Sequence, residues 1–461
     1  MKVLLATHFF PPNHPGGTEA YTLTLAREML RRGHSPHVIC AERWGAGSSW
    51  RPSYEDTLHE GVPVRRLYWN WQLAPNPFVN FYDNPEVERH FAEHVRRLRP
   101  DVMHATSCYA LGARIFGAAR REGVPTFLTL TDFWLLCHRH TLYRGDGSLC
   151  TGPESAVACQ ECIAYSIDGY RMLTRVVPRR LAAHVILGLS RWPRFARLRG
   201  LRGNVGNAEH RYRFLRRAFE DVDVAISPSL FLIEMFARNG YPTDRFRLSR
   251  HGLDTSWVSR VRTRDAHARP RVGYIGQIDP VKGVGLLVQA FLSIAAEVSA
   301  ELRIYGDLSR DPVFSSHLRR LVDGNPDIRL MGPFERNGIA DVLSELDFVV
   351  MPSFYYENSP VSIAEAFAAR RPVIATNLGG MSEMVEHGVN GLLFERGDVR
   401  GLAEAMRALI EDTALRERLR LGIKPVRSIE EEVDQLLDMY RVAVEDGSTR
   451  TTVSEGARIG R

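Results

Sequence analysis

Two glutamates, Glu357 and Glu365, flank a predicted helix start and are well placed to do chemistry. A short apolar run at residues 348–351 predicts a buried strand just before them. Ser359 is a favourable N-cap and Pro360 suits the first helical position, so we expect the helix to begin at Ser359. Free backbone N–H groups at a helix start beyond such a strand stabilise phosphates. The alternative is that Glu357 is an ordinary loop charge and Glu365 a solvated helix position.

Three other loops place glycine or lysine just before a predicted helix. Gly16 and Gly17 follow the first apolar run, and Gly379 and Gly380 form a similar pair near the other end of the chain. A glycine pair lets the backbone approach a ligand closely. Lys282 lies in a third loop, where it can neutralise a phosphate, although a solvated lysine is the alternative. Together the loops favour a diphosphate site, and the absence of a Gly-x-Gly-x-x-Gly motif disfavours a nicotinamide cofactor.

The elements that must position these loops alternate between strands and helices. The chain has 461 residues and is 44% hydrophobic, which favours two domains of similar size. Alternation of strand and helix predicts doubly wound parallel α/β sheets. The expected strands span residues 2–6, 37–40, 102–104, 126–130 and 224–226, and then 272–275, 301–305, 328–330, 348–351 and 373–375.

The alternation stops and restarts, which predicts two Rossmann-like domains facing each other across a cleft. We expect a first domain at residues 1–254, with an insertion at about 135–217, and a polar, Arg-rich linker at 255–270. The second domain is expected at 271–428. A final amphipathic helix at 429–445 should pack on a domain surface, and the polar tail at 446–461 should be disordered.

The opening apolar run is interpreted as a buried strand rather than a signal peptide, because two prolines interrupt it after a few residues. No apolar run is long enough to cross a bilayer. We therefore expect a cytoplasmic protein whose six cysteines are reduced thiols or metal ligands rather than disulfides.

Four of the six cysteines lie close together in the expected insertion and end in a Cys-x-x-Cys motif. They are Cys137, Cys150, Cys159 and Cys162. Four thiolates can bind a structural zinc ion tetrahedrally and fix a loop that has little apolar material. Their spacing is not that of a double Cys-x-x-Cys site, so unligated cysteines remain the alternative, with His138 or His140 as substitute ligands.

A strongly cationic block follows the cysteines. Residues 171–217 contain thirteen arginines and one acidic residue, Glu209. Large apolar side chains between the arginines favour an amphipathic helical surface for anionic lipid headgroups or a polyprenyl-diphosphate acceptor. A solvated helical excursion is the alternative. Nucleic acid is disfavoured, since no recognition fold or aromatic platform is evident.

Taken together, these loops resemble the retaining nucleotide-sugar glycosyltransferases of family 4, which have the GT-B fold. The resemblance covers most of the chain. It implies that the second domain binds the sugar nucleotide, the first domain binds the acceptor, and the final helix crosses back to the first domain. The family needs no metal or other cofactor for catalysis. The implied donor-binding residues are Gly16, Gly17, Lys282, Ser359, Pro360, Val361, Glu365, Gly379 and Gly380, and the implied catalytic residues are Glu357 and Asp132.

The resemblance assigns these residues distinct roles. Glu365 would bind the donor ribose and Glu357 the transferred sugar, while Lys282 and the amides of 359–361 would hold the diphosphate. Gly17 would complete the phosphate contacts from across the cleft. Retention would follow from front-face attack, with the leaving phosphate helping to deprotonate the acceptor. Cations and amide donors suit the charge that develops on a leaving diphosphate.

Two positions depart from the family pattern. Gln277 replaces an arginine of the lysine loop, for which Arg250 is a candidate substitute, and Thr131 replaces the histidine of a His-Asp pair, leaving Asp132. Three functions therefore remain open: a hexosyltransferase acting on a lipid-linked or polysaccharide acceptor at the membrane face, a GT-B nucleotide-sugar epimerase, and a non-catalytic protein that binds sugar nucleotides or anionic lipid.

Overall fold

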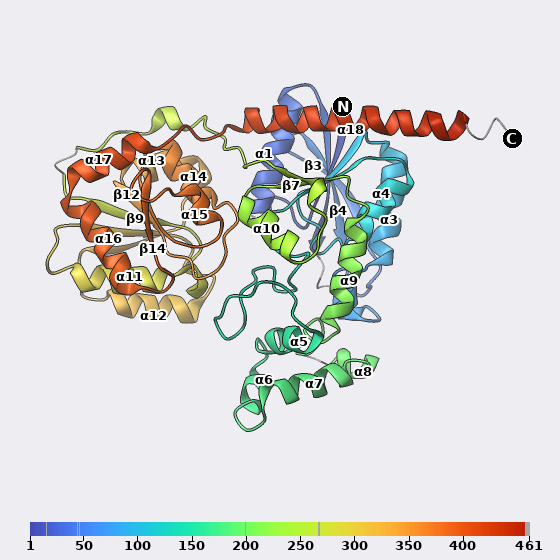
Figure 1. The fold of residues 1–461 in the computed structure, drawn as a ribbon, viewed down its shortest axis with the longest axis horizontal. Helices are drawn as coiled ribbons and strands as arrows, with labels where there is room; N and C mark the ends of the chain where they lie inside the picture. Colours follow the sequence, from blue (N-terminus) through green and yellow to red (C-terminus); the bar gives the residue numbers. More distant parts are fainter. Residues whose placement is uncertain (15, 44, 46, 199, 266–267, 457–461) are drawn as a thin grey trace. The chain divides into compact units, whose positions relative to one another are not determined.

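The computed structural model describes residues 1–14, 16–43, 45, 47–198, 200–265 and 268–456. The chain forms two compact units (Figure 1). The first comprises residues 1–228, 233–249 and 430–461, and the second comprises 229–232 and 250–429. Within the described residues, no helix is both long and apolar enough to cross a membrane.

The first unit is built on an eight-stranded sheet in the order β3-β4-β2-β1-β5-β6-β7-β8. All neighbours are parallel except β3 and β4. The order reverses between β1 and β5, which is where open α/β sheets bind ligands at the strands' carboxyl ends. The strands are β1 (Lys2–Thr7), β2 (Ser35–Arg43), β3 (Ser53–His59), β4 (Val62–Tyr68), β5 (Val102–Ala105), β6 (Thr126–Thr129), β7 (Val224–Ser227) and β8 (Phe246–Leu248).

Helices connect these strands as expected for a doubly wound sheet. The described helices of the first unit are α1 (Gly17–Arg31), α2 (Pro77–Asn80), α3 (Pro85–Leu98), α4 (Arg114–Arg121), α5 (Ala156–Ala164), α6 (Asp168–Leu173), α7 (Arg179–Leu189), α8 (Pro193–Ala196), α9 (Ala208–Phe219), most of α10 (Leu230–Arg238) and α18 (Ile429–Gly456). Asn84, the N-cap of α3, accepts hydrogen bonds from the N–H groups of Glu86 and Val87, and Pro85 follows it at the first helical position.

The second unit contains a six-stranded parallel sheet in the order β11-β10-β9-β12-β13-β14. Its order reverses between β9 and β12, so the loops that follow these two strands begin side by side. The strands are β9 (Arg271–Ile275), β10 (Glu301–Tyr305), β11 (Ile328–Gly332), β12 (Phe348–Met351), β13 (Val373–Thr376) and β14 (Gly391–Phe394), and the helices are α11 (Val284–Ile294), α12 (Pro312–Val322), α13 (Ile339–Ser344), α14 (Val361–Ala368), α15 (Gly380–Met384), α16 (Val399–Glu411) and α17 (Thr413–Gly422).

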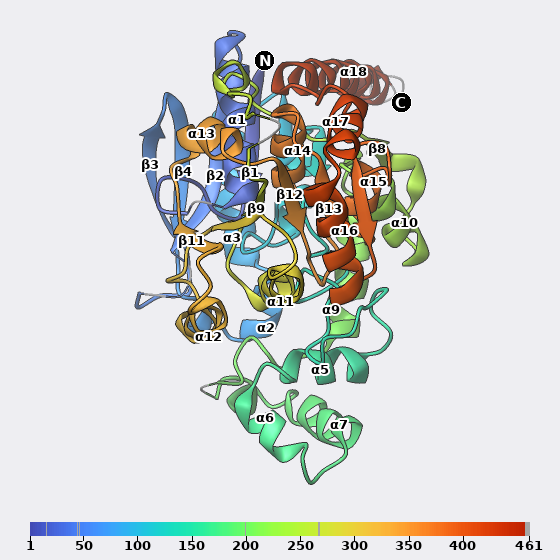
Figure 2. The same ribbon diagram turned by 90° about the vertical axis from the view of Figure 1, so that its left-hand side faces the viewer.

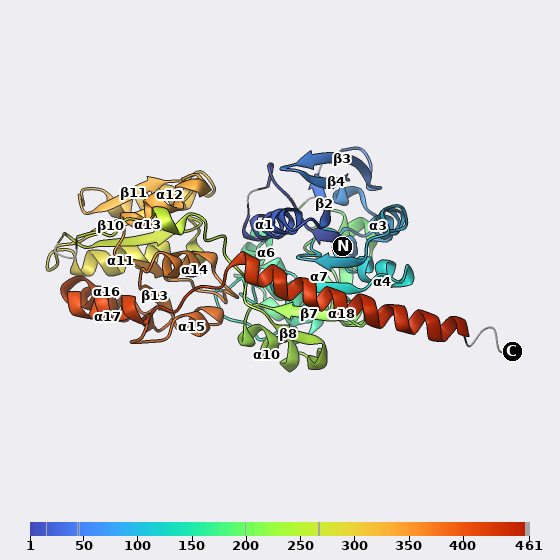
Figure 3. The same ribbon diagram turned by 90° about the horizontal axis from the view of Figure 1, so that it is seen from above.

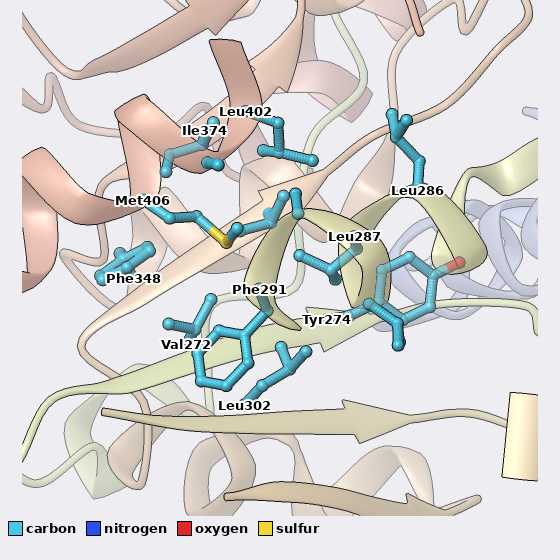
Figure 4. Close-up of a cluster of buried hydrophobic side chains, with 14 of the residues drawn as sticks. Val272, Tyr274, Leu286, Leu287, Phe291, Leu302, Phe348, Ile374, Leu402 and Met406 are labelled. Atoms are coloured by element: carbon cyan, nitrogen blue, oxygen red, sulfur yellow. The ribbon is translucent and has the colours of Figure 1, made fainter. Parts of the chain in front are cut away.

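Alternating strand residues of the second unit build two cores on opposite faces of the sheet. Val272 and Tyr274 point to the face covered by α11, α12 and α16, where Phe291 and Met406 are fully buried (Figure 4). Ile275, the next residue, packs on the other face with α13 and α14. Figure 2 shows α11, α12 and α16 together on one side of this unit. Because both faces are covered, the strands are continuous apolar runs, which made them predictable.

The last helix, α18, packs along the first unit (Figure 3). Buried Tyr440 hydrogen-bonds His104 on β5, and Glu432 accepts a 2.7 Å hydrogen bond from Tyr21 on α1. Residues 446–456, for which the sequence predicts a disordered tail, continue α18 in the structure, while 457–461 lie outside the described residues.

The insertion of the first unit is helical, with α5 to α8 grouped beyond the end of α9 (Figure 1). Its small core consists of Ala164, Tyr170 and Ala182. The larger aliphatic side chains Leu181 and Val185 of α7 are exposed instead. The alanine side of α7 is therefore packed, and its larger apolar side chains face outward.

Candidate functional site

In the second unit, the loops that follow β9 and β12 meet through a close ion pair. The Nζ atom of Lys282 lies 2.7 Å from Oε1 of Glu357, and the two side chains are only 17% and 13% exposed. Ser353 donates a second hydrogen bond to the same carboxylate oxygen at 3.2 Å. The two residues are 75 positions apart, and the adjacency of β9 and β12 brings their loops together.

An aromatic ring and burial strengthen this pair. The ammonium group of Lys282 lies 4.8 Å from the centre of the Tyr355 ring, a cation–π arrangement. Burial by itself would lower the pKa of Lys282, but the Glu357 carboxylate outweighs it and the pKa is raised. The lysine is therefore a fixed positive charge at neutral pH.

Backbone hydrogen bonds hold three loops of this site together. Phe354 donates its N–H to the carbonyl of Val281 at 2.9 Å, which fixes the glutamate loop to the lysine loop. Gly380 donates its N–H to the carbonyl of Glu357 at 2.7 Å. A Cβ atom on Gly380 would lie 1.8 Å from the carbonyl oxygen of Asn358, so only glycine allows this approach. The glycine pair thus fixes the loop that carries Glu357.

The helix after Glu357 begins later than the sequence predicts. Helix α14 starts at Val361, with Pro360 as its N-cap, whereas Ser359 was expected to cap it. Pro360 has an extended ψ of 120°, and the Ser359 hydroxyl contacts the sulfur of Met384 at 3.9 Å instead. Because the ψ of Pro360 is not helical, Pro360 is itself the last extended residue before the helix, and Ser359 lies one position too early to cap it. The carbonyl of Pro360 accepts the first hydrogen bonds of the helix.

Glu365 lies one turn inside α14 and is buried, with an exposed fraction of 7%. Its carboxylate pairs with Arg336 at 3.4 Å. Burial raises the pKa of Glu365, and Arg336 offsets this only in part. A buried carboxylate of this kind is destabilising by itself, which is typical of a ligand-binding group.

Gln277 and Arg250, its candidate substitute cation, contact different parts of the second unit. The backbone carbonyl of Gln277 accepts a 2.7 Å hydrogen bond from Tyr274. Arg250 lies 3.9 Å from Glu383, in helix α15 of the third glycine loop, so its recorded ion pair is with that helix and not with Glu357. Among the second unit's other cations, Arg396 donates to the carbonyl of Phe354 at 2.6 Å and so lies beside the glutamate loop.

The first unit has its own polar group at the carboxyl end of β1. Helix α1 begins at Gly17, and Gly16 is its N-cap. The Glu19 carboxylate folds back toward Gly16 and pairs with His8 at 3.1 Å. Burial alone would raise the pKa of Glu19, but the hydrogen bond and charge of His8 outweigh it and the pKa is lowered.

Asp132 follows β6 and lies beside a histidine that the sequence did not single out for this role. Its Oδ1 accepts the N–H of Trp134 at 2.7 Å, and its Oδ2 lies 3.8 Å from Nδ1 of His140. The His140 ring packs edge-on against Tyr109, and burial lowers its pKa to about 4. Thr131 donates to the carbonyl of Thr106 at 3.1 Å. An imidazole therefore lies near Asp132 although the preceding residue is threonine.

The four clustered cysteines lie around one cavity of about 40 Å³ in the first unit. Cys137 and Cys150 come from the loop after β6, while Cys159 and Cys162 come from α5. As the side chains lie, no three or more His, Cys, Asp or Glu residues of the described chain form a ready metal site.

Several residues of these sites were not predicted. Tyr355 and Arg336 contact the lysine and the buried glutamate of the second unit, and His140 contacts Asp132 in the first. The sequence carried a weak signal only for Tyr355, which is close to Glu357. Arg336 and His140 reach their partners through the tertiary fold.

Comparison with known proteins identifies both units. Residues 15–179 match the family described as Glycosyltransferase Family 4, and residues 269–412 match the family described as Glycosyl transferases group 1. Over 238 residues, the chain is 29% identical to D-inositol 3-phosphate glycosyltransferase 1 of Catenulispora acidiphila, covering 47% of this chain and 56% of that protein. It is 28% identical over 185 residues to the capsular polysaccharide biosynthesis glycosyltransferase CapM of Staphylococcus aureus, covering 39% and 46%.

The chain thus matches about half the length of these two relatives. Among solved structures, HepE of Anabaena in complex with UDP and glucose has a TM-score of 0.61 and 17% identity, with 95% of this chain and 99% of that chain covered. That level of identity supports the fold alone. The chain belongs to the family 4, group 1 glycosyltransferases, with two α/β units of the GT-B class.

Proposed function

We propose that the protein is a glycosyltransferase that moves a hexosyl unit from a nucleotide-diphosphate sugar to an acceptor. The observation that carries this proposal is the buried pair of Lys282 and Glu357, which lies beside the start of α14. An ammonium group suits the leaving diphosphate, and a carboxylate suits the sugar ring, on which positive charge develops. Buried Glu365 is suited to accept hydrogen bonds from the donor's ribose hydroxyls.

The donor is a nucleotide-diphosphate sugar by family membership and by this charge arrangement. HepE of Anabaena, whose fold is similar, was solved with UDP and glucose, so UDP sugars are the first candidates. D-Inositol 3-phosphate glycosyltransferase and CapM suggest two acceptor classes, a sugar phosphate and a growing polysaccharide. We favour a retaining reaction, in which the leaving phosphate helps to deprotonate the acceptor and Asp132 lies on the acceptor side.

Donor binding and donor turnover are to be measured separately. Calorimetric titration against UDP, GDP and ADP sugars should identify one nucleotide class, and Glu365→Ala should abolish that binding. Glu357→Gln should remove turnover while keeping nucleotide affinity. Glu404→Gln is the matched control, since Glu404 is an exposed glutamate of the same unit paired with Arg400. Unchanged turnover in Glu357→Gln would contradict the proposed site.

Two other functions predict different outcomes. A nucleotide-sugar epimerase would convert the donor without any acceptor and form no glycosidic bond. A non-catalytic binding protein would bind the nucleotide but convert nothing, with or without an acceptor. Product analysis of the donor with and without a panel of glycan and lipid-linked acceptors separates the three functions.

We further propose that the insertion brings the protein to an anionic membrane from the cytoplasmic side, where a lipid-linked acceptor is available. Seven exposed large apolar side chains of the described chain lie on it: Met172, Leu173, Val176, Leu181, Val185, Trp192 and Leu198. Exposed arginines alternate with them, including Arg175, Arg180 and Arg191. Apolar insertion combined with attraction to anionic headgroups favours peripheral binding.

Liposome flotation tests this attachment. The protein should float with vesicles that contain phosphatidylglycerol and should float less with vesicles of phosphatidylcholine alone. Leu181→Ser together with Val185→Ser should reduce flotation, whereas Val313→Ser, an exposed apolar residue of the second unit, should not. Equal recovery with both vesicle types would count against membrane attachment.

A further inference from the structure

The cavity in the insertion brings all four clustered cysteines together from two separate segments. Cys137 and Cys150 lie at the two ends of a loop, and Cys159 and Cys162 lie on α5. Residues three apart on a helix share one face, so both thiols of α5 can face the cavity. A total of four cysteines therefore surrounds a space of about 40 Å³, which is more than enough for a single ion.

Backbone hydrogen bonds fix the loop that carries the first two cysteines. Cys150 donates its N–H to the carbonyl of Leu142 at 2.8 Å, and the bridge between Tyr143 and Leu149 closes a small hairpin. Ser155 caps α5 by accepting the N–H of Ala158, so the second pair of cysteines is fixed as well. Both segments thus hold their thiols on rigid backbone, although neither has a large apolar core of its own.

The sulfur of Cys150 has a cationic donor beside it. The guanidinium of Arg144 lies 3.9 Å from this sulfur, and the thiol donates to the carbonyl of Gly152 at 3.1 Å. A cationic donor stabilises a thiolate in particular, because a thiol is only a weak acceptor.

A buried arginine beside the same cavity has no carboxylate partner. Arg211 is 2% exposed, lines the cavity, and donates one N–H to the carbonyl of Trp134. Its Nε–H group is buried without a hydrogen-bond acceptor, and none of the recorded ion pairs of the described chain includes Arg211. Its guanidinium lies over the rings of Trp134 and Tyr82, 5.1 and 5.9 Å from their centres, and a nearby anion would stabilise this buried charge further. Cys137 lines the same cavity.

We propose that Cys137, Cys150, Cys159 and Cys162 bind one zinc ion as four thiolates, with Arg211 as the buried counter-charge. Four thiolates and Zn²⁺ carry a net charge of about −2. Arg211 offsets one unit of this charge, while Arg144, beside Cys150, is also paired with Glu154. The thiols do not yet converge as they lie. Each has to turn toward the cavity by rotation about its Cα–Cβ bond, and each releases its proton to solvent as the sulfur binds the metal.

Zinc explains the arrangement better than disulfides do. Two disulfides would be neutral and would leave Arg211 without a counter-charge, whereas a zinc tetrathiolate supplies one. Zinc also stabilises the thiolate form by binding each sulfur directly. The metal would then fix the insertion to the first unit, a structural role separate from the chemistry at Lys282.

The test is metal analysis of the full-length protein purified from zinc-supplemented medium. We expect about one zinc per chain by mass spectrometry of the metal, and complete release when an organomercurial has titrated four thiols. Cobalt should replace zinc and give the absorption of a tetrahedral tetrathiolate. Cys159→Ser together with Cys162→Ser should lose the metal, and Cys40→Ala together with Cys108→Ala, the two cysteines outside the cavity, should retain it.

Arg211→Met tests the counter-charge while leaving all four ligands in place. Its zinc affinity, measured by chelator competition, should fall about 10- to 100-fold. Metal-free wild-type protein, metal retained by the Cys159/Cys162 variant, or a mass that shows intact disulfides would each overturn the proposal. If the serine variant fails to fold, the mercurial titration and cobalt spectrum of the wild-type protein still decide the outcome.

Discussion

Replacing Lys282 with methionine tests the central ion pair of the second unit. Removing one partner of a buried pair leaves the other charge uncompensated, which costs about 3–5 kcal/mol. Because Glu357 retains the hydrogen bond from Ser353 and is 13% exposed, we expect the lower end, about 3 kcal/mol of unfolding free energy. Lys282→Met together with Glu357→Gln removes both charges and should recover most of this loss. Urea unfolding of the wild type and the three variants gives the coupling energy.

The same variants separate stability from binding. A charge-assisted hydrogen bond to phosphate contributes about 1.5–3 kcal/mol, so Lys282→Met should weaken nucleotide diphosphate binding about 10- to 150-fold. Glu357→Gln frees the lysine and should leave that affinity equal or higher. Lys424→Met, an exposed lysine of the same unit paired with Glu386, is the control. Wild-type nucleotide affinity in Lys282→Met would refute the reasoning, whatever its stability.

Four further substitutions have expected outcomes. Burial raises the pKa of Glu365, so stability is lost as pH rises from the ordinary pKa of a glutamate through this raised pKa. Glu365→Gln should raise the melting temperature at pH 7 while weakening donor binding about tenfold. The pKa of His140 is about 4 in the folded protein, so the unfolded state binds this proton more readily and stability falls as pH falls from about 6.5 to 4. In denaturant titrations, His140→Asn should reduce this pH dependence of the unfolding free energy by up to about 3 kcal/mol. Gly380→Ala forces a Cβ against the Asn358 carbonyl and should reduce stability and donor binding. Gly285→Ala on α11 would place its Cβ 3.9 Å from Phe314 of α12 and should stabilise the protein by up to about 1 kcal/mol.

The elements buried on both sides could be predicted from the sequence. The ten expected strands are all present, because each is an apolar run in a sheet covered by helices on both faces. Strand β3, which was missed, has a weaker pattern. Its sequence SYEDTLH is mostly exposed and pairs antiparallel at the sheet edge, so it carries no apolar run. Strand β14, GLLF, was also missed, although it is an apolar run of the same length as β12.

The site was predictable where one loop contains it and unpredictable where distant loops meet. The glycine pair at Gly379 and Gly380 and the lysine loop were predictable as turns, because turns depend on local backbone, and the structure places both beside the loop of Glu357. The partner of Lys282 depends on the strand order instead, which places β12 beside β9. Arg336 reaches Glu365 from the connection between β11 and β13. Side-chain pairing of this kind has no local sequence signal.

Thr131 stands where the family pattern has a histidine before Asp132, yet the fold places the imidazole of His140 beside Asp132. The turn that begins at Phe133 brings His140 back to Asp132. The backbone N–H of Phe133 donates to the carbonyl of His140 at 3.0 Å, and the backbone N–H of His140 donates to the carbonyl of Cys137 at 3.1 Å. Cys137 is one of the four thiols around the cavity. If zinc fixes this cysteine, it also fixes the turn and therefore the imidazole.

The proposed metal and the proposed acceptor side are thus coupled through the backbone of the first unit. Chelation should lower turnover and leave nucleotide affinity unchanged, because the residues around Lys282 belong to the second unit. Calorimetric titration of the donor nucleotide and a turnover assay on the same zinc-free sample measure both quantities. A parallel loss of nucleotide affinity would mean that zinc supports the whole fold, and unchanged turnover would mean that His140 needs no support from the cysteines.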